Sequence, residues 1–162
     1  MTSFQEFLHK KAEEQKRGFR PDRRDEWIAA VDKLNRQIVD WLRESDPEQL
    51  LEIIPETVEK AEKGLGTYRV PALKIGVGNR MVRVVPIARN LVNPLLGDGT
   101  TLGGRVDITD GSKKYMLRRI LRDSSPNREG PDEAPWEVLD EHFGVTPLDR
   151  GRLESILQDL LS

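Results

Sequence analysis

Cysteine is absent from the sequence, and histidine is nearly absent: the 162 residues include only His9 and His142. Without cysteine the chain can form no disulfide bond, no thiolate nucleophile and no cysteine-ligated zinc site. Neither histidine has a second histidine four residues away, as zinc-binding helices have. We therefore interpret both as surface residues and predict no metal site.

Long apolar runs are absent as well. No stretch approaches the ~18 apolar residues of a membrane span, and the polar start of the chain lacks the apolar core of a signal peptide. Hydrophobic residues make up 36% and charged residues 33% of the sequence, and the mean hydropathy is −0.59. Because one domain usually occupies about 150 residues, we expect a single cytoplasmic domain with a charge-rich surface and no membrane partner.

Glycine motifs typical of nucleotide binding are incomplete. The Gly76-Val77-Gly78 sequence lacks the third glycine of a dinucleotide fingerprint, and the glycine-rich residues 97–104 lack the Gly-Lys-Ser/Thr ending of a phosphate loop. Both segments precede predicted strands, whereas a phosphate site needs the N-terminus of a helix. These glycines are therefore interpreted as turn residues, and no cofactor is predicted.

The net charge of −2 conceals a segregation of charge along the chain. Lys and Arg number 12 against 15 Asp and Glu in residues 1–64, 11 against 3 in residues 65–122, and 3 against 10 in residues 123–162. These blocks carry −3, +8 and −7, which total the −2 of the whole chain. A basic centre and an acidic tail of this kind need either each other or an external partner.

Residues 1–20 are predicted to form a charged helical arm. Ser3 and Glu6 fit a capping box at the start of a helix that runs to about Arg17, before Gly18. The apolar face of this helix is thin, so the arm is expected to be loosely held.

A second helix is predicted at about residues 23–44. Its apolar residues recur at alternating spacings of four and three, at Trp27, Val31, Leu34, Ile38 and Trp41. Asp46 and Pro47 then predict the N-cap and first turn of a short helix. The domain proper, residues 21–162, therefore begins with a helical part at residues 21–56.

The sheet is predicted at residues 57–140. Strand-forming residues flank a Gly-Asn pair at residues 78–79 and an Asp-Gly pair at residues 110–111, both typical of two-residue hairpin turns. Residues 136–139 predict another short strand, and residues 57–63 fit either a helical turn or an edge strand.

The last predicted element is a helix at residues 146–161, with Thr146 as its N-cap and Pro147 in its first turn. Polar residues 93–104 and 123–134 are predicted to be mobile loops. The predicted fold class is α+β: an antiparallel β-meander of five or six strands, covered by the long second helix and the C-terminal helix, with the helical arm at the N-terminus.

The predicted hairpins place basic side chains on one face of the sheet. With a two-residue turn at residues 110–111, Asp107 lies opposite Lys114 and forms an ion pair with it. In the first hairpin, Lys74 lies directly opposite Arg83. Opposed like charges cost of order half a kcal/mol, and such conflicts are frequent at binding sites. We define the basic sheet face as Lys74, Arg83, Arg105, Lys114, Arg118 and Arg122.

Two interpretations of the basic sheet face remain open. It binds an anion or a nucleic-acid backbone, or the acidic tail neutralises it, with Glu137 on a neighbouring strand. The second is favoured because the pI of about 5.8 is low for a nucleic-acid-binding domain. The position of residues 136–139 decides between them, since pairing beside Arg118 would cancel the charges internally.

Trp27 and Trp41 also have two interpretations. Tryptophan is a frequent anchor at interfaces, so both are candidate partner-binding residues. A helix must first bury its apolar stripe against its own sheet, however, and this requirement favours core packing.

No arrangement of catalytic side chains is recognisable in the sequence. The leading hypothesis is a non-enzymatic protein–protein interaction or assembly module of a bacterial-type cytoplasmic protein, which contacts another protein or a second copy of itself. The alternative is a binder of anions or nucleic acid through the basic sheet face. A small hydrolase with an unrecognised carboxylate site is the third hypothesis.

Overall fold

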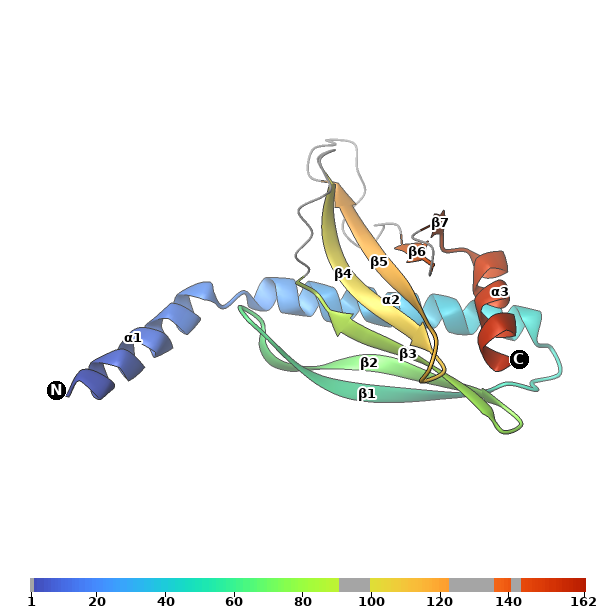
Figure 1. Ribbon diagram of the computed structural model, residues 1–162, viewed down its shortest axis with the longest axis horizontal. Coiled ribbons are helices and arrows are strands. Elements are labelled where there is room, and N and C mark those ends of the chain that lie inside the picture. Colours follow the sequence, from blue (N-terminus) through green and yellow to red (C-terminus); the bar gives the residue numbers. More distant parts are fainter. Residues whose placement is uncertain (1, 91–99, 123–135, 141–143) are drawn as a thin grey trace.

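The chain has the predicted α+β fold (Figure 1). The computed structural model describes residues 2–90, 100–122, 136–140 and 144–162, without the side chains of residues 100–102 and 122. Two helices, α1 (Ser3–Gly18) and α2 (Pro21–Ser45), precede an antiparallel sheet, and α3 (Arg150–Leu161) follows it.

The sheet is a meander whose strands lie in the order of the chain, each antiparallel to its neighbour. Its seven strands within the described residues exceed the five or six predicted, because residues 52–62 form one long edge strand and residues 145–147 add a short one. The strands are β1 (Glu52–Glu62), β2 (Gly66–Val77), β3 (Arg80–Ala88), β4 (Thr100–Thr109), β5 (Lys114–Arg122), β6 (Trp136–Leu139) and β7 (Val145–Pro147).

The core lies between one face of this curved sheet and the helices α2 and α3, as predicted (Figure 1). We call this face the inner face and its opposite the outer face. The apolar stripe of α2 and every second residue of the strands are buried together, and each large side chain buried in this way contributes roughly 1.5–3 kcal/mol. The core residues include Trp27, Val31, Leu34, Ile38 and Leu42 from α2, and Ile75, Val84, Val106, Ile108 and Leu117 from the sheet.

The predicted helical arm is helix α1, which extends away from the rest of the molecule (Figure 1). Its N-cap is Thr2, whose hydroxyl accepts a hydrogen bond from the Gln5 backbone N–H, while the Gln5 side chain accepts one from the Thr2 N–H. The predicted capping box of Ser3 and Glu6 was therefore wrong by one residue, since Thr2 and Gln5 form it. None of the helices in the described part of the chain is both long and apolar enough to cross a membrane.

The short helix predicted after Asp46 is not formed. The Asp46 carboxylate instead accepts hydrogen bonds from the backbone N–H groups of Leu50 and Leu51, at 2.9 and 2.8 Å, and closes a turn in which Gln49 has a φ of 55°. This turn directs the chain into β1 at residue 52. The helical part therefore ends at Ser45, and residues 57–63 follow the strand alternative through residue 62.

The first hairpin has the predicted register. Strands β2 and β3 pair Leu73 with Val84 and Lys74 with Arg83. Gly78 has a φ of 59°, which the turn requires and which glycine adopts without strain.

The second hairpin differs from the prediction because its turn has four residues, 110–113. The Asp110 carboxylate accepts hydrogen bonds from the N–H groups two and three residues ahead, at 2.8 and 2.7 Å, which stabilises the longer turn. Lys114 consequently pairs with Thr109, and the predicted Asp107–Lys114 pair is wrong. A slip of two residues keeps every side chain on its predicted face.

Two further boundaries differ from the predictions. Residues 100–104, predicted as part of a mobile loop, belong to β4, while residues 93–99 and the loop predicted at 123–134 lie outside the described residues. The C-terminal helix begins at Arg150 with Asp149 as its N-cap, because residues 145–147 pair with β6.

Candidate functional site

Three residues of the basic sheet face form a row across the outer face. Lys74 is opposite Arg83, and Arg83 and Lys114 are both in register with Thr109 on β4. The Arg83 Nε lies 3.4 Å from a carboxylate oxygen of Glu56 on β1. Lys74 and Lys114 have no ion pair within the described residues, so this row retains two uncompensated charges.

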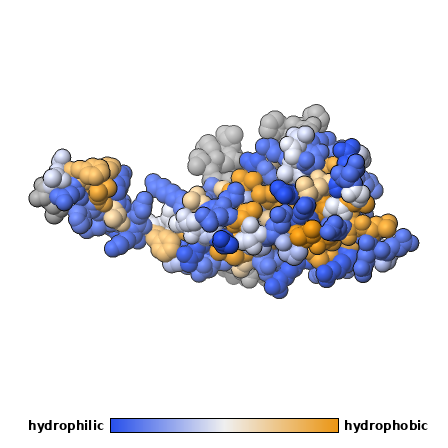
Figure 2. All heavy atoms as spheres, turned by 90° about the horizontal axis from the view of Figure 1, so that it is seen from below, coloured by the Kyte–Doolittle hydropathy of each residue, from blue (hydrophilic) through white to orange (hydrophobic). Residues whose placement is uncertain are grey.

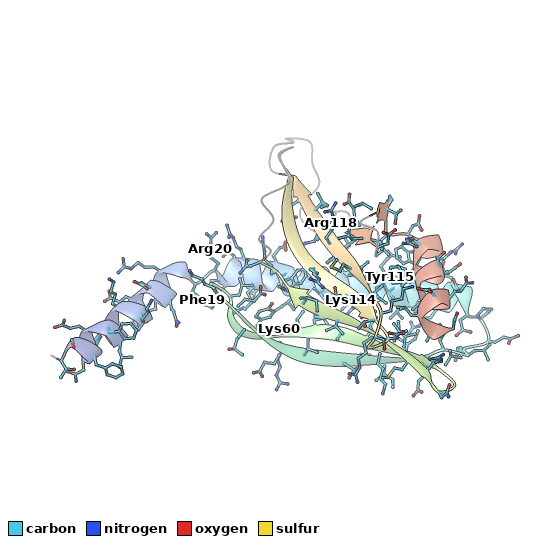
Figure 3. The ribbon with its side chains drawn as sticks, in the orientation of Figure 1. Phe19, Arg20, Lys60, Lys114, Tyr115 and Arg118 are labelled. Carbon is cyan, nitrogen blue, oxygen red and sulfur yellow. The ribbon has the colours of Figure 1, made fainter. Side chains whose placement is uncertain are left out.

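Two further arginines of this face, Arg105 and Arg118, are neutralised by neighbouring carboxylates. Arg105 donates two hydrogen bonds to Asp107, at 2.8 and 2.9 Å. Arg118 lies on β5, as does Lys114 (Figure 3). It pairs in register with Glu137 on β6, and its guanidinium lies 3.0 Å from the Glu137 carboxylate. Part of the acidic tail therefore lies in the sheet and compensates a basic residue, as the neutralisation hypothesis requires.

The remaining predicted residues lie apart from this row. Arg122 pairs with Thr100 at the far end of β5, and its side chain lies outside the described residues. Trp27 is fully buried in the core, which fits the core-packing interpretation and leaves no surface of Trp27 for a partner. Trp41 is half-buried and packs against the core.

A second group of charged residues lies on the inner face, centred on Arg119. This side chain is fully buried, and its guanidinium lies 2.7 Å from a Glu26 carboxylate oxygen on α2. It also donates hydrogen bonds of 3.0 and 2.8 Å to the Gly103 carbonyl and stacks over the Trp27 ring at 5.5 Å. A buried charge needs this number of partners to offset its desolvation.

Gly104 makes the close approach of Trp27 to the sheet possible. A Cβ at this position would lie 2.1 Å from the Trp27 ring, and the φ of 140° also favours glycine. Gly104 pairs with Arg119, so the indole occupies the space beside the guanidinium.

Glu62 and Tyr68 extend this inner-face group. The Tyr68 hydroxyl donates a short hydrogen bond to Glu62, whose carboxylate also accepts from the backbone N–H groups of Arg89 and Asn90 at 2.9–3.1 Å. Burial, followed by the hydrogen bond to Glu62, raises the pKa of Tyr68 well above its usual range. The hydroxyl therefore remains protonated, and the Glu62 carboxylate accepts hydrogen bonds from three neutral donors of the fold.

The sequence contained one signal for the inner-face group. Alternation along β5 places Leu117 and Leu121 on the apolar face, and the same alternation places Arg119 between them. A charged residue at an apolar position indicates a buried ion pair or a binding site. No local pattern indicates Glu26, because it reaches Arg119 from another element.

A third feature is a groove of about 820 Å³ between the C-terminal end of α2 and α3. Apolar side chains from both helices and from the following turn line it, and carboxylates stand around them. The apolar lining is Leu42, Leu51, Leu157 and Leu161, and the carboxylates are Glu44, Asp46 and Glu154, with Arg150 paired to Glu44 at 3.0 Å.

Helix α3 is joined to β5 beside this groove by a small polar cluster. Asp159 lies 2.6 Å from the Lys113 Nζ and accepts a hydrogen bond of 2.5 Å from the Tyr115 hydroxyl. Hydrogen bonding to Lys113 and then to Tyr115 lowers the pKa of Asp159, while the hydrogen bond to Asp159 raises the pKa of Tyr115. The cluster thus favours the ionised carboxylate and the protonated phenol.

The free end of α1 exposes an apolar surface (Figure 2). Phe4, Phe7 and Leu8 are 66%, 52% and 48% exposed, and α1 contains no buried residue. The Lys11 Nζ lies 5.9 Å from the Phe7 ring centroid, on the same side of the helix. We call Phe4, Phe7, Leu8 and Lys11 the arm face.

Metal-binding groups are not assembled in the described part of the chain, where no three His, Asp or Glu side chains cluster suitably. His9 is exposed on α1, and His142 lies outside the described residues. Comparison of the chain with protein-family models, with curated proteins and with solved structures finds no match. Function must therefore be argued from the chain's own surfaces.

Proposed function

We propose that the chain is a non-enzymatic interaction module that associates with a second copy of itself, with the arm face of one copy in the groove between α2 and α3 of the other. The observation that carries this proposal is the arm itself. A helix of 16 residues exposes two phenylalanines and a leucine and has no contact that buries them. Exposed apolar clusters of this kind usually mark interaction sites.

The arm cannot reach the groove of its own chain. Helix α2 has 25 residues and is about 37 Å long, with the arm attached at its N-terminal end and the groove at its C-terminal end. Even folded back along α2, the arm would place Phe4 only about 21 Å from the junction, 14 residues away. The groove of another copy is free of this restriction.

The two surfaces are complementary in chemistry. An amphipathic helix binds an apolar groove through residues at positions i, i+3 and i+4, the spacing of Phe4, Phe7 and Leu8. Leu51 and Leu161 are the partly exposed leucines of the groove lining, while Leu42 and Leu157 are buried beneath it. The groove also has three carboxylates against one arginine. Lys11 lies beside Phe7 and is paired with Glu14 at 3.5 Å on the exposed arm. In the groove it would exchange this exposed partner for carboxylates of the acceptor.

Analytical ultracentrifugation over a concentration series tests this proposal. The wild-type mass should rise above 18.5 kDa with concentration, while Phe7→Glu should remain monomeric because it places a carboxylate in the apolar contact. The matched control is His9→Glu, which adds the same charge on the opposite side of α1 and should associate normally. Circular dichroism checks that both variants keep their helices.

A complementation experiment identifies the acceptor surface. Gln158 is exposed and lines the groove, so Gln158→Trp should fill the groove and abolish self-association without disturbing the core. An equimolar mixture of Phe7→Glu and Gln158→Trp should associate again, since one variant keeps its groove and the other its arm. A wild-type monomer at all concentrations, or a monomeric mixture, would contradict the proposal.

A further inference from the structure

We propose that Gly64, in the turn between β1 and β2, is a positioning residue that fixes the angle at which the arm leaves the rest of the molecule. Its carbonyl and its lack of a side chain hold the junction of α1 and α2 in place. The inference rests on the proposed function for the purpose of the arm, whereas the fixed angle itself is measurable on the monomer.

The connection between the two helices has little slack. Helix α1 ends at Gly18 and α2 begins at Pro21. Only Phe19 and Arg20 lie between them, and proline restricts the backbone of the residue before it. The Phe19 backbone N–H still donates a hydrogen bond of 3.4 Å to the Lys16 carbonyl of α1. The connection is therefore tied to the helix that it leaves.

The turn between β1 and β2 lies against this connection. Figure 3 shows Phe19 and Arg20 between the two helices, at the tip of the β1–β2 hairpin. The Arg20 backbone N–H donates a hydrogen bond of 2.6 Å to the Gly64 carbonyl. A Cβ on Gly64 would lie 2.9 Å from the Gly18 carbonyl oxygen, closer than a Cβ normally approaches, and the φ of 81° also favours glycine. The end of α1 and the start of α2 are thus held against one residue.

The Phe19 side chain makes a second contact at the junction. The Arg24 guanidinium of α2 lies over its ring, 5.3 Å from the centroid. A Cβ on Gly66 would lie 3.5 Å from the same ring, at ordinary van der Waals distance, so the ring reaches the start of β2. The ring therefore bridges α2 and β2 and resists rotation of the chain at Phe19.

The turn is itself anchored to the body of the molecule. Leu65, which follows Gly64, is buried and belongs to the core. Asn90, which lies beyond the end of β3, makes two hydrogen bonds to the turn. Its side chain donates to the Lys63 carbonyl at 3.0 Å, and its backbone N–H donates to the Glu62 carboxylate at 2.9 Å. The turn is therefore a fixed support for the arm.

A fixed angle favours association through the arm. No residue of α1 is buried, so within the described part of the chain only the junction can set the direction of the helix. A helix on a flexible tether loses orientational freedom when it binds, whereas a helix already held at one angle loses little. More of the contact energy then appears as affinity.

Distances between two spin labels measure the angle. The chain has no cysteine, so labels attach only at introduced cysteines, His9→Cys on α1 and Gln37→Cys on α2, both at exposed positions. The Phe7→Glu background keeps the arm free of a partner. Double electron–electron resonance should then give one narrow distance distribution. A distribution as broad as that of two freely jointed helices would overturn the proposal.

Gly64→Ala tests the role of this residue. The added Cβ should displace the end of α1 and shift or broaden the distribution beyond the width that it has with glycine. The matched control is Gly78→Ala, the same change in another hairpin turn, where φ is 59° and nothing lies within 4 Å of the added Cβ. It should leave the distribution unchanged, and circular dichroism checks that both variants are folded. An unchanged distribution in Gly64→Ala would contradict the assignment.

Self-association of unlabelled chains with the native Phe7 gives the second readout. Gly64→Ala should raise the Kd about tenfold, since binding must then also order the arm, while Gly78→Ala should not change it. An unchanged Kd in Gly64→Ala would contradict the role of the angle in association. If wild type remains monomeric but has a narrow distribution that depends on Gly64, the fixed angle holds and the proposed function is wrong.

Discussion

Arg118 and Arg119 are adjacent on β5 yet lie in opposite environments. Arg118 points to the outer face, where its side chain is 22% exposed and meets Glu137 from β6. Arg119 points to the inner face, where it is fully buried and meets Glu26 from α2. Each has one carboxylate partner, but only Arg119 also needs a carbonyl and an aromatic ring, because water solvates Arg118 and cannot reach Arg119.

The repulsion between neighbouring like charges also differs between the two faces. Lys74 and Arg83 are directly opposed on the outer face, where solvent screens them and Glu56 lies beside Arg83. Arg89 and Arg119 flank Gly104 on the inner face, where screening is weak. Solvent therefore weakens the repulsion at the surface, whereas on the inner face the carboxylates of Glu26 and Glu62 offset it.

The largest expected difference between the two faces concerns these neighbouring arginines. Arg119→Met should lower the free energy of unfolding by about 3 kcal/mol, because it leaves Glu26 without its partner in a largely buried position. Arg118→Met should lower it by about 1 kcal/mol or less, since partly exposed ion pairs contribute little. Urea denaturation monitored by circular dichroism measures both values.

The matched control is a double-mutant cycle with Glu26→Gln. If the Arg119–Glu26 pair is coupled, the double variant should be more stable than the sum of the single effects predicts, by about 1 kcal/mol or more. Equal effects of Arg118→Met and Arg119→Met would show that the two faces do not differ as described.

A smaller effect is expected on the outer face. Lys74→Glu replaces a like-charge pair with an opposite-charge pair across from Arg83 and should stabilise the chain by about 0.5 kcal/mol. Lys74→Gln should give only the part of this stabilisation that comes from removing the repulsion. The stabilisation by Lys74→Glu should become smaller at high salt. Destabilisation by Lys74→Glu would indicate that Lys74 has a role in the fold that its contacts do not reveal.

The smallest expected effect concerns the exposed cluster that joins α3 to β5. The folded pKa of Asp159 is below its ordinary value of 3.8, so its contribution to stability is present above that pH and is lost as the pH falls through the lower folded value. Asp159→Asn should therefore be less stable than wild type at neutral pH, with the difference shrinking below pH 3.8. Urea midpoints along a pH series measure it, and a constant difference would contradict the assignment.

The sequence predicted the elements whose signals are local. The spacing of apolar residues in α2 and the register around residues 78–79 were both confirmed, because helix periodicity and a two-residue turn are determined by neighbouring residues. The turn at residues 110–113 was predicted too short, since the Asp110 side chain stabilises a four-residue turn that the Asp-Gly pair does not indicate.

The candidate sites were predictable only in part. Alternation correctly placed Arg105 and Arg118 on the outer face, and the sequence suggested Glu137 as a partner for the basic residues. Arg119 was not among the predicted residues, although alternation with Leu117 and Leu121 indicates the inner face, and no short-range pattern pairs it with Glu26, 93 residues away. Contacts of that separation depend on how the sheet curves around α2.

The sequence by itself determined the segregation of charge, the absence of cysteine chemistry, the apolar face of α2 and the alternation of the strands. These are properties of composition and of local periodicity. The tertiary structure alone decided which charges are compensated, because compensation depends on distance and burial between elements far apart in the chain. It paired Arg118 with Glu137 of β6 and Arg119 with Glu26 of α2.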